Sequence, residues 1–155
     1  MGLIMFDIFK GLGTPAEGEK SVFNFLSDED LKNLSAFFES KNIPAGETLW
    51  NEEDPFDYIA FIVSGKVEIK KEMEFGDMNV IMGIYSKGAL CILDDSLRKV
   101  TAVALEDTSL AIITQENLDK LIDTNPGLGA KLLKSMLLTV SDRLRKSFDR
   151  IVAFF

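Results

Sequence analysis

The sequence predicts a mainly β domain, an antiparallel sandwich or barrel, with helices on either side of it. Two observations predict this fold class. Residues 43–114 contain many short apolar or alternating runs that are separated by turn signals, as in a series of short strands. Residues 27–41 and 115–155 instead repeat their apolar side chains at helical spacing. A chain of 155 residues is long enough for one domain with a sizeable core.

The first helix of the domain is expected to begin at Ser27. Its hydroxyl can cap the free N–H groups, and the acidic residues up to Asp30 suit the positive end of the helix dipole. We expect this helix to end near Lys41, because the residue before Pro44 disfavours the helical conformation. The apolar residues expected to share one core are Phe23, Phe25, Leu26, Leu31, Leu34, Phe37 and Phe38.

Residues 1–21 form an N-terminal lead and linker in this interpretation. The lead is apolar, and we expect it to pack on the domain as a short helix; contact with a membrane or a partner is the alternative. The glycine-rich part from Gly11 to Gly18 indicates a loop. The start lacks the basic head and cleavage site of a signal peptide, and no run approaches the ~20 apolar residues that span a bilayer.

Turn residues divide the central region into extended segments. We expect strands at 48–50, 58–63, 67–69, 78–84, 98–105 and 109–114. An acidic loop at 51–57, a charged hairpin tip at 72–77 and a turn at 106–107 connect them. After the last strand, Thr114 is placed to cap a short helix that ends before Pro126.

A long helix follows, since about 28 residues run to the end of the sequence without a strong breaker, a length of roughly 40 Å. One small β domain cannot cover such a helix. Its apolar stripe comprises Leu133, Leu137, Val140, Leu144, Ile151 and Phe155, at the spacing of a coiled-coil seam. We therefore expect a homodimer through the 127–155 helix; the alternative is that the helix lies on its own β domain.

Composition excludes several classes of function. The net charge of −8 argues against a nucleic-acid-binding surface. The sequence has no histidine, which removes the commonest metal ligand and general base, so we assign no catalytic or metal-binding residue and no enzymatic activity. The single cysteine, Cys91, cannot form an internal disulfide; we expect it to be buried and reduced, consistent with a cytoplasmic location.

The stretch from Gly88 to Ala104 is a candidate anion site. A glycine-bounded turn offers backbone N–H groups, and Arg98 stands alone at the head of the next extended run. The alternative is that Arg98 pairs with Asp94 or Asp95 and only closes the loop.

Three segments in matching order and spacing carry a family resemblance. Ile43–Tyr58 resembles the strand entry of the cyclic nucleotide-binding domain family, with Glu53 where a glycine is usual. Phe61–Ile69 resembles its strand pair around a turn glycine, and Arg98–Asp107 resembles the strand that an arginine opens. The resemblance covers residues 22–150. It implies a 22–155 domain built as a double-stranded β-helix, or jelly roll, over 43–114, with an N-terminal helix and long C-terminal helices over 115–155.

The resemblance also implies a phosphate site. Gly88 matches the glycine of the family's phosphate-binding cassette, and Arg98 matches the arginine that pairs with the cyclic phosphate. Thr101 matches a threonine or serine near the ligand. The candidate ligand-binding residues are Lys87, Gly88, Ala89, Leu90, Arg98, Lys99 and Thr101. The family takes its base contacts from the long helix, where Ser135, Thr139 and Ser141 are polar candidates that the sequence does not rank.

Two departures weaken the implied site. Ala89 replaces the glutamate that binds the ribose 2′-hydroxyl, and Leu97 replaces a proline. Losing a charge-assisted hydrogen bond of roughly 1.5–3 kcal/mol lowers affinity about ten- to hundredfold. Lys87, in place of an aromatic residue, adds a cation that can partly offset this loss.

The resemblance therefore implies a stand-alone regulatory module that binds cAMP, cGMP or another small phosphate weakly or with altered preference. The sequence has no room for a helix-turn-helix after the long helix, so we expect no DNA binding and a separate protein as output partner. The alternative is a degenerate relative that has lost its nucleotide and acts as a homodimeric interaction domain. A third hypothesis, a cupin-like metalloenzyme, is disfavoured by the lack of histidine.

Overall fold

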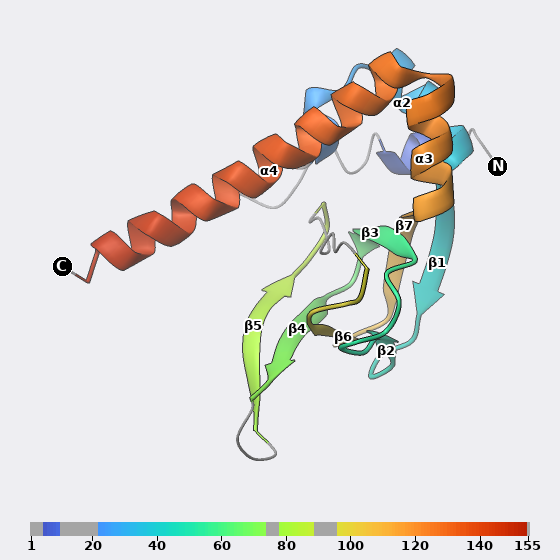
Figure 1. The fold of residues 1–155 in the computed structure, drawn as a ribbon. Helices are drawn as coiled ribbons and strands as arrows, with labels where there is room; N and C mark the ends of the chain where they lie inside the picture. Colours follow the sequence, from blue (N-terminus) through green and yellow to red (C-terminus); the bar gives the residue numbers. More distant parts are fainter. Residues whose placement is uncertain (1–4, 10–21, 74–77, 89–95, 155) are drawn as a thin grey trace.

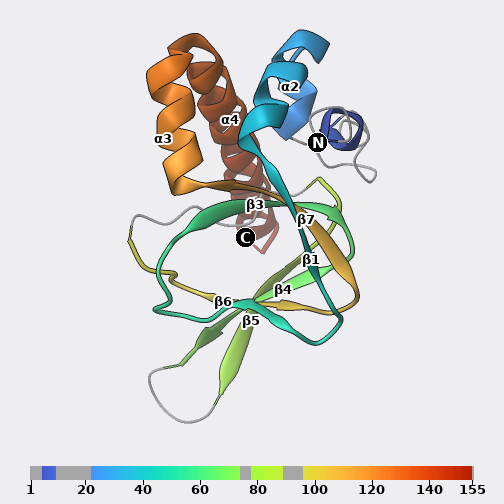
Figure 2. The same ribbon diagram turned by 90° about the vertical axis from the view of Figure 1, so that its right-hand side faces the viewer.

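A computed structural model describes residues 5–9, 22–73, 78–88 and 96–154. Within these residues, seven strands form two antiparallel sheets, and helices gather at one end of them (Figures 1 and 2). The first sheet has the order β1-β7-β3, with β1 at Glu39–Ile43, β7 at Thr108–Thr114 and β3 at Tyr58–Ser64. The second has the order β2-β6-β4-β5, with its strands at Thr48–Trp50, Thr101–Ala104, Val67–Glu72 and Asn79–Tyr85. The predicted fold class, mainly β with flanking helices, is confirmed.

The N-terminal helical region follows the expected start but not the expected end. After the 3₁₀ turn η1 (Val22–Phe25), α2 (Asp28–Leu34) begins with a capping box: Asp30 N donates to Ser27 Oγ at 3.1 Å, and Ser27 N donates to Asp30 Oδ2 at 3.2 Å. The helix ends at Leu34, and the 3₁₀ turn η2 (Ser35–Phe37) follows, so the prediction of a helix to Lys41 was wrong.

Strand pairing explains that early end. Residues 39–43 form β1, which pairs with β7 from Glu39 opposite Ile112 to Ile43 opposite Thr108. Inside the last helical turn, Ser35 Oγ donates to the carbonyl of Leu31 at 2.8 Å, a local bond that favours helix termination. The ladder with β7 therefore overrides the weak helical preference of a polar segment, and the roll begins earlier than residue 43.

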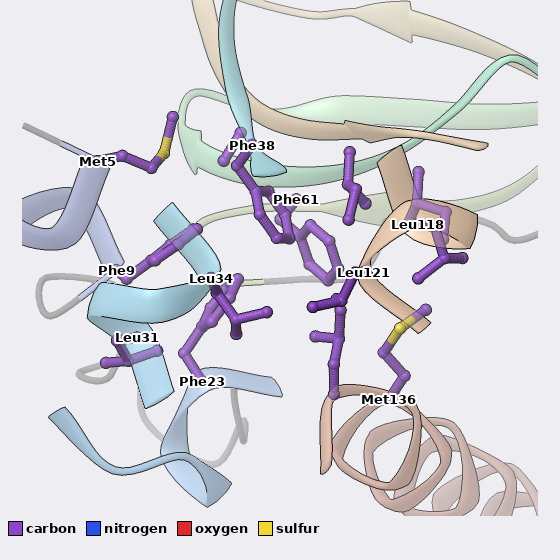
Figure 3. Packing of buried hydrophobic residues seen from close by; sticks show 14 of the residues in the cluster. Met5, Phe9, Phe23, Leu31, Leu34, Phe38, Phe61, Leu118, Leu121 and Met136 are labelled. Carbon is purple, nitrogen blue, oxygen red and sulfur yellow. The ribbon is translucent and has the colours of Figure 1, made fainter. Parts of the chain in front are cut away.

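The helical end holds one of two hydrophobic clusters (Figure 3). Residues 5–9 are helical, and Phe9 stacks on Phe23 at 4.6 Å between ring centroids and meets Phe38 edge-on at 4.9 Å. The prediction that the lead packs as a short helix is thus confirmed for these residues; Leu3 and Ile4 lie outside the described residues. Phe25, expected in this core, is instead 42% exposed.

The second cluster fills the space between the sheets with Ala60, Ile62, Val67, Ile69, Ala102 and Leu110, among others. Two turns at its edges have left-handed backbone. Gly65 has φ +97°, and a Cβ there would lie 2.4 Å from Thr108 Oγ1, so only glycine fits this turn. Glu53 has φ +71°, which explains why a glycine is usual at that position in the family it resembles.

Two helices close the chain. Thr114 Oγ1 accepts a hydrogen bond from Asn117 N at 3.1 Å and so caps α3 (Gln115–Thr124), as predicted. The 27 residues of α4 (Pro126–Val152) follow and extend well past the sheets (Figure 1). One face is buried from Leu128 to Thr139. The predicted stripe is exposed along α4, at Leu133, Leu137, Val140, Leu144 and Ile151. None of the helices in the described part of the chain has the length and apolarity needed to cross a membrane.

Candidate ligand-binding site

Arg98 lies just before β6, where the acidic loop 51–57 holds its backbone. Arg98 N donates to the carbonyl of Asp54, and the carbonyl of Arg98 accepts from Glu53 N, both at 2.8 Å. A bridge between Pro55 and Leu97 continues this pairing. Regular β6 pairing starts only at Thr101, so the predicted strand 98–105 is shorter than expected. The first residues of that segment serve instead to fix Arg98 against the loop.

The Arg98 side chain is buried in an aromatic cage and is only 2% exposed. Its guanidinium carbon lies 3.7 Å from the ring centroid of Trp50, 4.6 Å from that of Phe56 and 5.1 Å from that of Tyr58. Nη2 donates to the carbonyl of Tyr58. A desolvated cation–π contact stabilises by about 2 kcal/mol or more, so the cage holds the side chain firmly. A ligand phosphate that engages Arg98 has to compete with these contacts.

Gly88 occupies the expected turn. Its φ is +84°, and it is buried. Its N–H donates to the carbonyl of Ile62 at 2.9 Å, so this donor closes the turn onto β3. The neighbouring Lys87 is exposed. Ala89 and Leu90 lie outside the described residues, as do the apolar run 91–93 and the aspartates at 94 and 95 that formed the alternative partners of Arg98.

Thr101 and Lys99 are tied to the acidic loop through Glu52. Thr101 Oγ1 accepts a hydrogen bond from Glu52 N at 3.0 Å. The Glu52 carboxylate accepts from Glu72 N at 2.6 Å and pairs with Lys71 Nζ at 3.3 Å. Lys71 Nζ also donates to the carbonyl of Lys99 at 3.0 Å. The structure thus brings Arg98, Lys99 and Thr101 together with residues 51–57, while Gly88 is bonded to β3.

A cleft of about 640 Å³ lies between β5 and the second half of α4. Its lining residues are Met82, Gly83, Ile84, Tyr85, Thr139, Asp142, Arg143, Lys146, Ser147, Asp149 and Arg150. The Arg143 guanidinium carbon lies 4.9 Å from the ring centroid of Tyr85, which joins the two walls. Lys146 Nζ pairs with Asp142 Oδ2 at 3.1 Å, and Arg150 Nη2 donates to Ser147 Oγ at 3.1 Å.

Of the three polar candidates on the long helix, Thr139 alone lines the cleft. Its hydroxyl donates to the carbonyl of Ser135 at 3.0 Å. Ser135 is buried and donates to the carbonyl of Lys131, and Ser141 is not among the lining residues. Arg143, which the sequence analysis did not single out, lines the same cleft. The available signal was its helical spacing, because Arg143 follows Thr139 by one turn and shares its face of the helix.

Comparison with known proteins supports the assignment of the fold. The family model described as "Cyclic nucleotide-binding domain" matches residues 40–125, more than half of the chain. The chain belongs to the cyclic nucleotide-binding domain family. A solved cyclic nucleotide-binding domain from Methylobacillus flagellatus shares its fold with a TM-score of 0.79 and 23% identity, over 99% of this chain and 85% of that chain. The Thermus thermophilus catabolite activator protein aligns with a TM-score of 0.68 and 26% identity, over 86% and 62%.

Curated relatives of this cyclic nucleotide-binding domain are much longer proteins. The potassium voltage-gated channel unc-103 of Caenorhabditis elegans is 31% identical over 131 residues, which covers 77% of this chain and 15% of the channel. Lysophospholipase nte1 of Aspergillus terreus is 27% identical over 124 residues, which covers 77% of this chain and 8% of that protein. The chain therefore spans between 8% and 15% of the length of these relatives.

Proposed function

We propose that this chain is a regulatory sensor module that binds a cyclic nucleotide, or a similar small phosphate, weakly or with altered preference. The observation that carries the proposal is the buried Arg98 inside the roll of a cyclic nucleotide-binding domain. Arginine keeps its charge in proteins, so a buried guanidinium is a strong local positive charge with which a phosphate can pair. The candidate ligands are cAMP and cGMP, in a non-enzymatic, cytoplasmic protein that passes its signal to a separate partner.

The aromatic cage around Arg98 supports the proposal that the phosphate binds only weakly. Contacts with Trp50, Phe56 and Tyr58 stabilise Arg98 in the position seen here. A phosphate that binds Arg98 has to offset the contacts that it displaces. If Arg98 binds the phosphate only in a rarely populated side-chain conformation, the apparent affinity falls in proportion to the population of that conformation. Ala89, which lacks the carboxylate for a ribose hydroxyl, adds to the same effect.

The cage also favours the alternative function, a relative that no longer binds nucleotide. In that case Arg98 serves only to lock the acidic loop onto the roll through Tyr58 and the backbone of residues 53–54. The function then resides in assembly. The exposed stripe of α4, residues 133–151 at seam spacing, is the surface through which we propose a homodimer.

Thermal denaturation of the full chain with cAMP or cGMP separates the two functions. A ligand at a hundred times its Kd stabilises the folded state by about 2.7 kcal/mol. For a chain of this size we expect a rise in Tm of at least about 5 °C at millimolar nucleotide. Linear 5′-AMP and 5′-GMP serve as controls for unspecific anion effects. An unchanged Tm with both cyclic nucleotides contradicts a sensor of cAMP or cGMP and favours the assembly domain.

A further inference from the structure

Trp50 carries a buried hydrogen-bond donor that has no acceptor. The residue is only 4% exposed, and its indole Nε1–H finds no acceptor among the residues that the structure describes. Buried polar groups in proteins are almost always paired, because an unpaired one has lost its hydration without replacement. A phenyl ring would fill this place without that cost. The indole therefore indicates an acceptor that binds here.

The surroundings of Trp50 favour an anion as that acceptor. The guanidinium carbon of Arg98 lies 3.7 Å from the centroid of the indole ring, and Arg98 is itself buried. Arginine stays charged in proteins, so a buried guanidinium attracts negative charge to its neighbourhood. A hydrogen bond to a charged acceptor is also stronger than one to a neutral acceptor. A charged oxygen beside this pair of side chains gains from both.

Trp50 can donate without giving up its contact with Arg98. The N–H of an indole lies in the plane of the ring, whereas the Arg98 guanidinium lies over the face of the ring. Tyr58 holds the indole from another side, with 5.9 Å between the ring centroids and 75° between the planes. The backbone of Trp50 pairs with β6 opposite Ala102. A donor that is already held in place loses little conformational freedom when it binds.

We propose that Trp50 Nε1–H donates a hydrogen bond to an oxyanion, such as the phosphate of a cyclic nucleotide, that binds next to Arg98. The inference rests on the sensor function proposed above. The family resemblance places candidate ligand contacts between residues 87 and 101 and on the long helix, so Trp50, which ends β2, is an addition to that set. The inference uses the charge of Arg98 and the N–H of Trp50, and no particular N–H of the arginine.

The unpaired donor favours the bound state over the free state. The N–H of Trp50 has no hydrogen bond in the arrangement seen here, so an oxyanion that accepts from it adds a bond without breaking one at this atom. A ligand shifts a conformational equilibrium by its difference in affinity for the two states. The new bond therefore offsets part of the rearrangement that brings a ligand to two buried side chains.

Nuclear magnetic resonance of the full chain, labelled with ¹⁵N, tests the inference directly. Trp50 is the only tryptophan in the sequence, so the protein gives a single indole N–H signal. We expect cAMP or cGMP to move this signal downfield, as a donor does when it enters a hydrogen bond to a charged oxygen. Adenosine and guanosine, which lack the phosphate, are the control ligands and should leave the signal in place.

The variant Trp50→Phe provides the second measurement, because it keeps an aromatic ring beside Arg98 and removes the donor. Isothermal titration should show affinity for the cyclic nucleotides lowered about ten- to hundredfold, the effect of one hydrogen bond to a charged acceptor. The matched control is Tyr58→Phe. It removes a hydroxyl from another ring of the cage, one that bonds to Lys41 Nζ and the carbonyl of Leu49, and should change the affinity by less than about twofold.

The outcomes separate this inference from the function it rests on. Nucleotide binding with an unmoved indole signal, an equal shift with the nucleosides, or unchanged affinity in Trp50→Phe overturns the role of Trp50 and leaves the sensor intact. Binding of neither cyclic nucleotide overturns both this role and a sensor of cAMP or cGMP. Thermal unfolding without ligand shows whether Trp50→Phe is folded; if it is not, the indole signal of the wild-type protein decides.

Discussion

Arg98 and Arg143 make the same kind of contact in two very different places. Each guanidinium lies over an aromatic ring, but three rings and a backbone carbonyl enclose Arg98, whereas Arg143 covers one ring at the rim of a cleft. Arg98 is 2% exposed, and Arg143 is half-buried. A cation–π contact is worth more when it is desolvated. The comparison teaches that enclosure decides how much such a contact stabilises the fold: the enclosed one contributes more than the open one.

Removing the enclosed arginine gives the largest expected change. Arg98→Ala should lower the free energy of unfolding by about 2–4 kcal/mol, because the cation–π contacts are lost and a cavity remains. Urea denaturation followed by circular dichroism measures the loss. Arg98→Met, which keeps most of the volume, separates packing from charge. A loss below about 1 kcal/mol in Arg98→Ala would mean that the cage contributes little to stability. The enclosed arginine would then not differ from the open one in its effect on folding.

The next largest effect concerns the helix that carries the open arginine. Val140 and Leu144 flank Arg143 on the exposed stripe of α4. If that stripe pairs with a second copy, the wild-type protein should sediment at about twice 17.3 kDa. Val140→Glu should weaken the dimer by tenfold or more, because the introduced carboxylate would be buried in the helix pair. Sedimentation across a concentration series measures both. Lys134→Glu, on an exposed residue outside the stripe, is the control. A monomeric wild type contradicts the predicted dimer.

A smaller effect is expected in the loop that positions Arg98. Glu53 has φ +71°, which costs a non-glycine residue about 1 kcal/mol. Glu53→Gly should therefore raise the free energy of unfolding by about that amount, while the matched Glu52→Gly should lower it by removing the bonds to Lys71 and Glu72. Urea denaturation of both variants provides the test. Destabilisation by Glu53→Gly would show that the Glu53 side chain supports the loop.

The smallest effect on stability is expected at the open arginine. Arg143→Ala should change the free energy of unfolding by no more than about 1 kcal/mol, the upper value for an exposed cation–π pair. The same denaturation assay measures it beside Arg98→Ala. A loss comparable to that of Arg98→Ala would show that Arg143 is also a structural residue, and the contrast between the two sites would disappear.

Local signals in the sequence were sufficient for the frame of the molecule. Ser27 and Thr114 cap their helices as predicted. Gly65 lies in a turn, as expected for a glycine between two extended runs. Strand β1 escaped prediction because its residues are mostly polar, and pairing with β7 across more than sixty positions makes it a strand. Nothing in residues 39–43 alone encodes that partner. Local sequence signals therefore determine where helices begin and where turns form. Strand pairing between distant segments can override these local preferences.

The site was harder to predict for the same reason. Arg98 was predicted to pair with a phosphate, and that role remains a prediction. Its cage comes from Trp50, Phe56 and Tyr58, which are at least forty positions earlier in the chain. Arg143 could be placed on one face of its helix from periodicity. That this face meets Tyr85 depends on where α4 lies against the rest of the domain, and this follows from tertiary packing that includes Leu128, Leu132 and Met136. The phosphate roles of Lys87 and Gly88 remain predictions.

The last buried residue of α4 is Thr139, and the helix continues to Val152. These final residues reach about 20 Å beyond that point. Because of this length, a tilt of about 10° at Thr139 would displace the far end of the helix by about 3–4 Å. A small change of packing at the buried half of α4 would therefore correspond to a several-fold larger displacement at its exposed end.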